Sequence, residues 1–336
     1  MSINIRPVNK VIVVSDLHLG EEECLLFKKN AKLLKSFKDK LEKEANKGKV
    51  DELIIIGDLF DLSLASFKDA YNKGKEFFKE IGQIGNLDTI VYVPGNHDHH
   101  IWSLIIEEEQ IVKNIRKGKS PEEPLKRVDE EYNDTFLNEL LKETGKKFLV
   151  SYPNLFRKIG EKNYLFHHGH LMDRIFTPVE TILPARDIGE LESFNTFWLE
   201  SLWYHTGQAG RLSSIVEWGY EEIQDIKKNV EELLKKAGKT IKGILKGKEA
   251  GELNRQITNY IKFCVLTKDK IPDNFVFGHT HRKETGYPLD IEFNINGEKV
   301  ERKINICNTG GWHGDSNKDH TCFIVIDSNG AQLCKI

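Results

Sequence analysis

The sequence of 336 residues predicts an α/β fold on the basis of three observations. Short apolar runs rich in β-branched and aromatic residues recur along the chain, which is typical of buried strands. Between the first two runs, leucines at helical spacing over residues 21–47 indicate a strand–loop–helix–strand unit with parallel strands. After residue 271 the chain returns to β structure, and the pair Asn296-Gly297 predicts a hairpin turn there.

The predicted elements follow in chain order. Five buried strands are each expected to end at a polar motif, over residues 11–15, 53–56, 90–93, 164–166 and 275–277. The remaining elements are two helices, the hairpin and a last buried strand, over residues 21–47, 66–82, 291–306 and 321–327.

The charge and hydrophobic patterns divide the chain into a core and two insertions. Residues 1–184 and 271–336 are expected to form the core, within which the highly charged segment 103–147 predicts helices and a loop on the surface. Residues 185–270 carry two amphipathic stretches and predict a helical cap. Such a cap would pack on the core, narrow the access to the site and set substrate choice.

Each polar motif directly follows an apolar run and is built from metal-ligand residue types. In α/β folds the carboxyl ends of strands gather ligand sites, so these residues are expected to meet. Any one motif alone would favour an ordinary turn or surface pair, but their joint occurrence in this order points to one site. The motifs are Asp16-Leu17-His18, Gly57-Asp58-Leu59-Phe60-Asp61, Gly95-Asn96-His97-Asp98, His167-His168-Gly169-His170 and Gly278-His279-Thr280-His281.

This mixture of residues suits a centre of two divalent metal ions. Mn²⁺, Fe²⁺ and Zn²⁺ accept carboxylate, amide oxygen and imidazole ligands. Two ions about 3.5–4 Å apart can clamp a phosphoryl group, and a hydroxide that bridges them can attack the phosphorus. A histidine just outside the ions can protonate the leaving alkoxide. Two such ions are therefore the expected cofactors, with manganese as the first choice and iron, zinc or nickel as alternatives.

The five motifs resemble those of the calcineurin-like metallophosphoesterase superfamily, over roughly residues 10–100, 150–180 and 270–330. The resemblance implies two mixed β-sheets packed as a sandwich and flanked by helices, with a helical insertion. It also implies seven metal ligands, which are Asp16, His18, Asp58, Asn96, His168, His279 and His281.

Within that implied set the residues have different roles. Asp58 would bridge both ions, while Asp16, His18 and His281 would bind one ion and Asn96, His168 and His279 the other. By the same resemblance His97 would be the general acid, Asp98 would orient the His97 ring, and Asp61 would lie just outside the ligands.

Two groups of histidines leave alternatives open. His167, His168 and His170 compete for one ligand position, and His168 is chosen because the ligand commonly precedes a glycine in the family. Five other histidines are expected to be surface or structural residues, namely His99, His100, His205, His313 and His320.

Composition bounds the class of protein. The net charge of −3 provides no basic footprint and does not favour nucleic acid as the substrate. No apolar run is long enough for a membrane span, and the first residues lack the apolar segment of a signal peptide. Five scattered cysteines indicate reduced thiols, so a cytoplasmic protein is expected.

The sequence therefore predicts an enzyme that hydrolyses a phosphate mono- or diester of a small or medium-sized molecule. A DNA-repair-type nuclease is an alternative, because the segment 15–20 also resembles the start of such enzymes. A pyrophosphohydrolase of a nucleotide-linked lipid precursor is another, since those enzymes carry a helical insertion and a His-Gly motif. A non-catalytic scaffold would require a lost ligand or a lost catalytic histidine, and none is missing.

Overall fold

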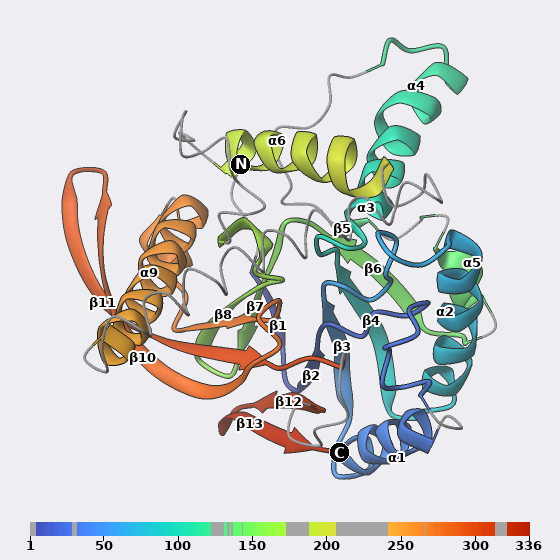
Figure 1. Cartoon of the computed structure of the whole chain (residues 1–336), viewed down its shortest axis with the longest axis horizontal. Helices are drawn as coiled ribbons and strands as arrows, with labels where there is room; N and C mark the ends of the chain where they lie inside the picture. The colour runs from blue at the N-terminus through green and yellow to red at the C-terminus, as the bar shows by residue number, and fades with distance from the viewer. Residues whose placement is uncertain are drawn as a thin grey trace.

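The structure is a computed structural model, and its elements are labelled in Figure 1. It describes residues 5–28, 32–121, 131–132, 135, 137–142, 144–172, 188–205, 241–265, 267–312 and 321–336.

Two mixed β-sheets form the centre of the protein. The seven-stranded sheet contains, in spatial order, β13 (Gly330–Lys335), β12 (Cys322–Asp327), β2 (Val11–Val14), β3 (Val50–Ile56), β4 (Leu87–Val93), β6 (Lys147–Ser151) and β5 (Glu131–Tyr132). The six-stranded sheet contains β1 (Arg6–Val8), β7 (Asn154–Ile159), β8 (Lys162–His167), β9 (Asn274–Phe277), β11 (Glu298–Thr309) and β10 (Lys283–Ile295). Strands β2, β3 and β4 pair in parallel, as do β8 and β9, whereas β7–β8 and β10–β11 are antiparallel.

The two sheets pack face to face through a buried apolar layer. Val13 and Ile54 of the seven-stranded sheet share this layer with Tyr164 and Val276 of the six-stranded sheet. Because side chains alternate across a strand, the intervening residues face the helices outside. The sandwich expected from the family resemblance is confirmed.

Helices cover the outer face of the seven-stranded sheet. These are α1 (Lys32–Asn46), α2 (Phe67–Gly82) and α5 (Asn138–Leu141). Phe37 of α1 and Phe77 of α2 are fully buried and stack with ring centroids 6.2 Å apart. Ser66 caps α2 by accepting a hydrogen bond from the Asp69 amide at 3.1 Å, so the helix predicted over 66–82 is confirmed.

The first predicted helix begins later than the leucine spacing suggested. Helix α1 starts at Lys32, and residues 21–28 form turns instead of the helix predicted from residue 21. The Leu25 amide donates to the Trp312 carbonyl at 2.8 Å, and the Cys24 thiol donates to the Leu17 carbonyl at 3.1 Å. These tertiary hydrogen bonds bind the segment to the loops beside it, and local helical propensity does not override them.

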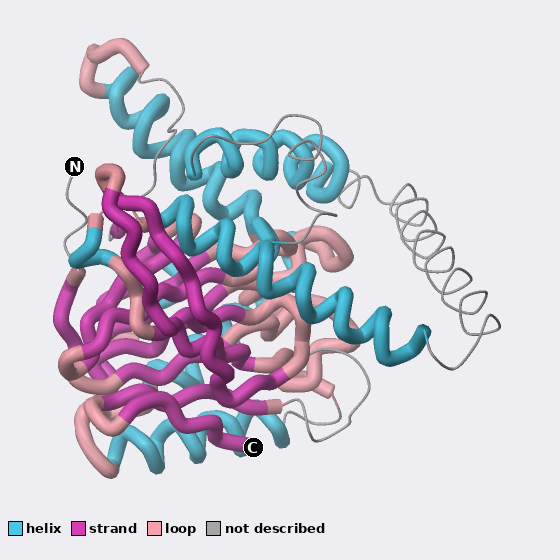
Figure 2. The backbone as a smooth tube through the Cα atoms, turned by 90° about the vertical axis from the view of Figure 1, so that its left-hand side faces the viewer, coloured by secondary structure: helices cyan, strands magenta, loops and turns pink. Residues whose placement is uncertain are grey.

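The outer face of the six-stranded sheet is covered by α9 (Ile241–Cys264). Ile257, Tyr260 and Ile261 of this helix are buried against Leu165 and Phe275. Figure 2 shows helices above and below the block of strands and one helix lying across it. Before α9, the chain forms α6 (Ile188–Trp198) and the π-helical turn η4 (Leu199–Tyr204). The second amphipathic stretch predicted within 185–270, near residues 223–234, lies outside the described residues.

The hairpin and the charged segment also follow the prediction. Strands β10 and β11 join at Asn296 and Gly297, which have φ of 53° and 83°. A continuous helical rod runs from His99 as α3 (His99–Ile106), η1 (Glu107–Val112) and α4 (Lys113–Arg116). Short turns η2 (His170–Met172) and η6 (Lys268–Lys270) complete the elements used below. No helix in the described part of the chain is both long and apolar enough to cross a membrane.

Candidate metal centre

Loops after five strands carry the polar motifs and meet at one end of the sandwich. Asp16 and His18 follow β2, Asp58 follows β3, and the other motifs follow β4, β8 and β9. Five motif residues have a positive φ that side chains other than glycine rarely adopt, namely Asp16, His18, Asp58, His279 and His281. Such conformations cost about 1–3 kcal/mol each and persist where the surroundings impose them, as at functional sites.

Hydrogen bonds between the loops hold these conformations in place. The Asp16 amide donates to the Gly57 carbonyl at 3.1 Å, and the His18 amide donates to the Asp58 carbonyl at 2.9 Å. The His97 amide donates to Asp58 Oδ1 at 2.9 Å. At Gly95 a Cβ atom would lie 2.3 Å from Asp58 Oδ1, so only glycine lets the two loops approach this closely.

Two groups of potential ligands form in this way. Asp16, His18 and His281 can each place one ligand atom within 4.8 Å of the others, and so can Asp58, His168 and His279. Asp58 lies between the groups, because its Oδ2 is 3.1 Å from His168 Nε2 and 3.7 Å from His18 Nε2.

Asn96 belongs to the second group. Its Oδ1 lies 3.0 Å from His168 Nε2, the same nitrogen atom that faces Asp58. The other ring nitrogen of His168 is 3.0 Å from the Ile56 carbonyl, which fixes the ring orientation and leaves Nε2 directed at the group. The structure thus brings together all seven residues that the sequence predicted as ligands.

The competition among the three neighbouring histidines has a geometric answer. Of the three, His168 is the one directed at Asp58. The His167 ring packs on Tyr260 with centroids 4.2 Å apart, and neither ring nitrogen has a hydrogen-bond partner among the described residues. Burial lowers the pKa of His167 well below its ordinary value. His170 is also fully buried, and its Nε2 is 3.2 Å from the Tyr152 hydroxyl.

The carboxylate beside the His97 ring is Asp61. His97 Nδ1 is 3.0 Å from Asp61 Oδ2 and 2.6 Å from the Ser63 hydroxyl. The same Asp61 oxygen is 2.9 Å from His18 Nδ1. Asp98 was expected to orient the His97 ring, but its carboxylate accepts hydrogen bonds from the Leu59 and Gly95 amides at 2.7 and 2.6 Å. Asp61 therefore has the position that the sequence assigned to Asp98, and Asp98 ties the loops together.

The electrostatics of the site follow from burial and these contacts. Burial opposes ionisation of Asp58, but the His168, His97 and His18 rings outweigh it and hold the pKa well below the ordinary range. Burial lowers the pKa of His97, but Asp61 and Asp58 outweigh it and raise the pKa to about 10. Burial and the charge of Asp58 raise the pKa of Asp98 to about 6.

The donor set fits divalent cations. Asp16 and Asp58 are buried carboxylates, at 0% and 1% exposure, and among the described residues their ion-pair partners are histidines alone. Buried carboxylates are stable when they are paired with a cation or coordinate a metal. Protonated histidine rings can supply that charge, and the same rings can bind a divalent cation once they are neutral. Carboxylate, amide and imidazole donors together suit Mn, Fe and Zn ions.

Several residues around the site carried no clear sequence signal. Ser63, Glu192, Glu200 and Tyr152 contact motif residues or their neighbours, but isolated serines, glutamates and tyrosines are common on any surface. The glycine-rich segment at residues 308–312 ends β11 and continues into a loop. The Trp312 amide donates to the Asp16 carbonyl at 2.9 Å, so this loop stabilises the backbone of the first motif.

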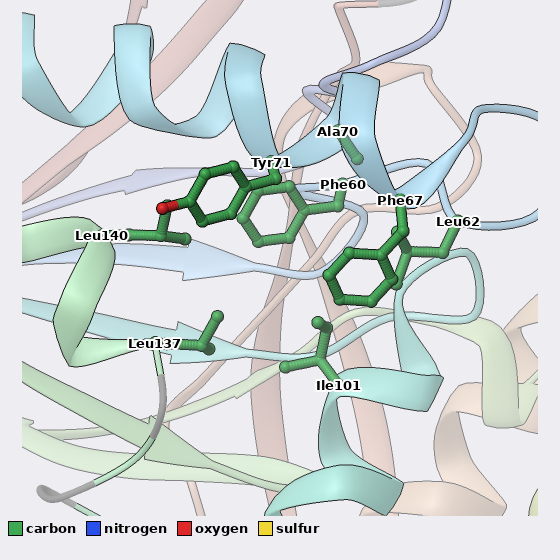
Figure 3. A pocket seen from close by; sticks show the side chains of 8 residues that line it. All are labelled: Phe60, Leu62, Phe67, Ala70, Tyr71, Ile101, Leu137 and Leu140. Carbon is green, nitrogen blue, oxygen red and sulfur yellow. The ribbon is translucent and has the colours of Figure 1, made fainter.

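An apolar cavity of about 150 Å³ lies on the other side of the loop after β3 (Figure 3). Phe60 and Leu62 line it, while the residues between and after them, Asp61 and Ser63, contact His97. None of the seven potential ligands lines this cavity, so it is separate from the polar site. Its lining consists of Phe60, Leu62, Phe67, Ala70, Tyr71, Ile101, Leu137 and Leu140.

Comparison with known families assigns the family of the chain. The model of the calcineurin-like phosphoesterase family matches residues 9–283, which is most of the chain. The chain belongs to the calcineurin-like phosphoesterase family. An uncharacterized metallophosphoesterase of Helicobacter pylori is 31% identical over 91 residues. This match covers 27% of the present chain and 20% of the Helicobacter protein, so the chain spans about a fifth of that relative. Family membership indicates a metal-dependent phosphoester hydrolase, in agreement with the clusters of potential ligands.

Proposed function

We propose that this protein hydrolyses phosphate mono- or diesters with two divalent metal ions held by the seven motif residues. The observation that carries the proposal is the position of Asp58, whose Oδ2 faces His18 of one ligand group and His168 of the other. A single carboxylate placed in this way can hold two cations at a short and fixed separation.

The proposed ligands fall into two sets, one for each ion. Asp16, His18 and His281 would hold one ion, and Asn96, His168 and His279 would hold the other. When bound, two such ions would polarise the phosphoryl oxygens and make a water molecule nucleophilic near neutral pH. Manganese is the proposed metal, with iron, zinc and nickel as alternatives, because this donor set suits all four.

His97 is proposed as the general acid. Ser63 donates its one hydroxyl hydrogen to Asp61 Oδ1 at 2.9 Å, so it can only accept a hydrogen bond from His97 Nδ1. This arrangement keeps Nδ1 protonated and oriented, and Nε2 becomes the nitrogen that delivers a proton to the leaving oxygen. The carboxylates of Asp61 and Asp58 favour the protonated ring, which is the form that an acid needs.

The proposed substrates are phosphorylated molecules of small or medium size. The ligand-bearing loops are largely buried, but His279, His281 and His97 are only partly buried, and the side chains of His281 and His97 are 36% and 19% exposed. A phosphoryl group would therefore enter beside these three histidines. The net charge of −3 provides no long-range attraction for a polyanion such as DNA.

The test is turnover of p-nitrophenyl phosphate and bis-p-nitrophenyl phosphate by protein stripped of metal and reloaded with Mn²⁺. Wild-type protein should require the metal, and Asp58→Asn should lose both bound ions and turnover. Asp290→Asn on the exposed part of β10 is the matched control and should behave as wild type. Two tightly bound ions with normal turnover in Asp58→Asn would exclude the bridging role.

A further inference from the structure

A series of buried polar side chains links α6 and η4 to two loops of the metal centre. We call it the polar bridge, and it consists of Glu192, Glu200, His99, Tyr152 and His170. Four of these side chains are buried, with exposures of 5% for Glu192, 1% for His99 and 0% for Tyr152 and His170. Burying polar groups this deeply costs free energy unless each one has a hydrogen-bond partner. The partners therefore fix the positions of these side chains.

Glu200 binds the start of α3. Its two carboxylate oxygens lie 2.7 Å from His99 Nδ1 and 2.7 Å from His100 Nδ1. These histidines directly follow His97 and Asp98 in the sequence. The sequence predicted both as surface or structural residues, and the structure shows that they attach η4 to the loop that carries Asn96 and His97.

Glu192 contacts the loop after β4 directly and reaches the loop after β8 through Tyr152, which lies between β6 and β7. Its Oε1 is 3.1 Å from His99 Nε2, and its Oε2 accepts a hydrogen bond from the Tyr152 hydroxyl at 2.9 Å. The Tyr152 oxygen is also 3.2 Å from His170 Nε2. Because tyrosine has one hydroxyl hydrogen and gives it to Glu192, His170 Nε2–H is the donor in this second hydrogen bond.

The two connected loops supply ligands to the same proposed ion. The loop after β4 carries Asn96, and the loop after β8 carries His168, two residues before His170. Asn96 Oδ1 and His168 Nε2 are 3.0 Å apart. A bridge that fixes one loop relative to the other therefore fixes the spacing of these two donor atoms.

We propose that Glu192 and Tyr152 are positioning residues that set the affinity of the second ion, which rests on the proposed ligand set. Apolar packing could attach α6 to the core, since Leu191 is already buried in the core beside the six-stranded sheet. Packing alone does not fix the direction of a loop, whereas hydrogen bonds from one carboxylate to His99 and Tyr152 do. Groups that support metal ligands in this way typically change metal affinity or activity by about 10–100-fold when removed.

The test is Mn²⁺ binding to the metal-free full-length protein, measured by isothermal titration calorimetry. The variants are Glu192→Gln, which removes the charge, and Tyr152→Phe, which removes one hydroxyl and keeps the ring. Each should weaken one of the two binding events by about 10–100-fold and change the other little. The double variant should bind the affected ion no more weakly than the single variant with the larger loss of affinity, because both substitutions act through the same contact.

Two controls separate positioning from general loss of structure. Ser193→Ala alters α6 next to Glu192, where the Ser193 hydroxyl donates to the Gly189 carbonyl of the same helix. Glu161→Gln makes the same charge change at a side chain that is 96% exposed. Both should bind two ions as the wild type does.

The possible outcomes decide between the explanations. Unchanged binding in Glu192→Gln and Tyr152→Phe would overturn the inference. Equal weakening of both ions together with a lower melting temperature of the metal-free protein would also overturn it. The isotherms need no substrate, so selective weakening supports the inference even if the wild type hydrolyses no ester, a result that would overturn the proposed function alone.

Discussion

The contact of His99 with Glu192 and Glu200 makes a measurable prediction about stability and pH. Burial lowers the pKa of His99, but its hydrogen bonds to these two carboxylates outweigh burial and raise the pKa from 6.5 to about 9. At 1.36 kcal/mol per unit, this shift corresponds to roughly 3 kcal/mol of stabilisation of the folded state. Two carboxylates share the effect, so Glu200→Gln should lose roughly 1–2 kcal/mol of unfolding free energy near neutral pH.

The sign of the pH dependence follows from the direction of the shift. A pKa that is higher in the folded state than in the unfolded state stabilises the protein fully below the unfolded value, about 6.5 for histidine. That stabilisation is lost as the pH rises through the folded value of about 9. The difference between wild type and Glu200→Gln should therefore be large at pH 6 and small at pH 10.

The assay is urea unfolding of the metal-free protein at these two pH values, followed by circular dichroism. Using the difference between two proteins cancels the titration of groups that both share. Glu161→Gln is the control, and it should match the wild type at both pH values because its side chain is exposed. A Glu200→Gln difference that stays the same from pH 6 to pH 10 would refute the reasoning.

Three further predictions concern the site itself. His97→Asn should keep the metals but lose about 10²–10⁴-fold in turnover, with a smaller loss for p-nitrophenyl esters than for alkyl esters, which need protonation; equal losses would count against the acid role. His168→Ala should lose metal while His167→Ala keeps it, as metal analysis will show, and the reverse pattern would exchange their roles. Ser63→Ala should reduce turnover of alkyl phosphates more than turnover of p-nitrophenyl phosphate, because its hydroxyl orients the acid and not the metals; a variant that loses metal instead would contradict this.

The order of motifs and strands made it predictable from the sequence that the motif residues lie together. Buried strands such as Val11–Val14 leave a clear apolar pattern, and a motif at the end of each strand must lie near the motif of its parallel neighbour. Asp16 and Asp58 meet for this reason, since β2 and β3 are paired. The sandwich could not be derived from periodicity, because the pattern of a strand does not specify which sheet packs on its buried face.

The contacts around the ligands were not predictable, because they join residues that are distant in sequence and ordinary in type. Asp98 is adjacent to His97, and the family resemblance implied that it orients the ring. Neighbouring side chains in a loop often point in different directions, and Asp61, 36 positions earlier, reaches the ring instead. Glu200 likewise lies 101 residues from His99, and nothing in the sequence distinguishes it from the many other glutamates.

The sequence predicted residues 185–270 as a helical cap that packs on the core, and the described part of this segment makes two kinds of contact with the core. Ile257, Tyr260 and Ile261 of α9 bury the outer face of the six-stranded sheet, so this helix is a layer of the core. Glu192 and Glu200 of the preceding helical segment contact the histidines that follow His97. One part of this segment covers a sheet, and another part binds the loop of the proposed acid. We therefore expect the segment to affect more than substrate choice. Substitution of Glu192 in this segment should therefore alter metal affinity and turnover together. Removing the whole segment would expose apolar sheet surface before any effect on specificity could be measured.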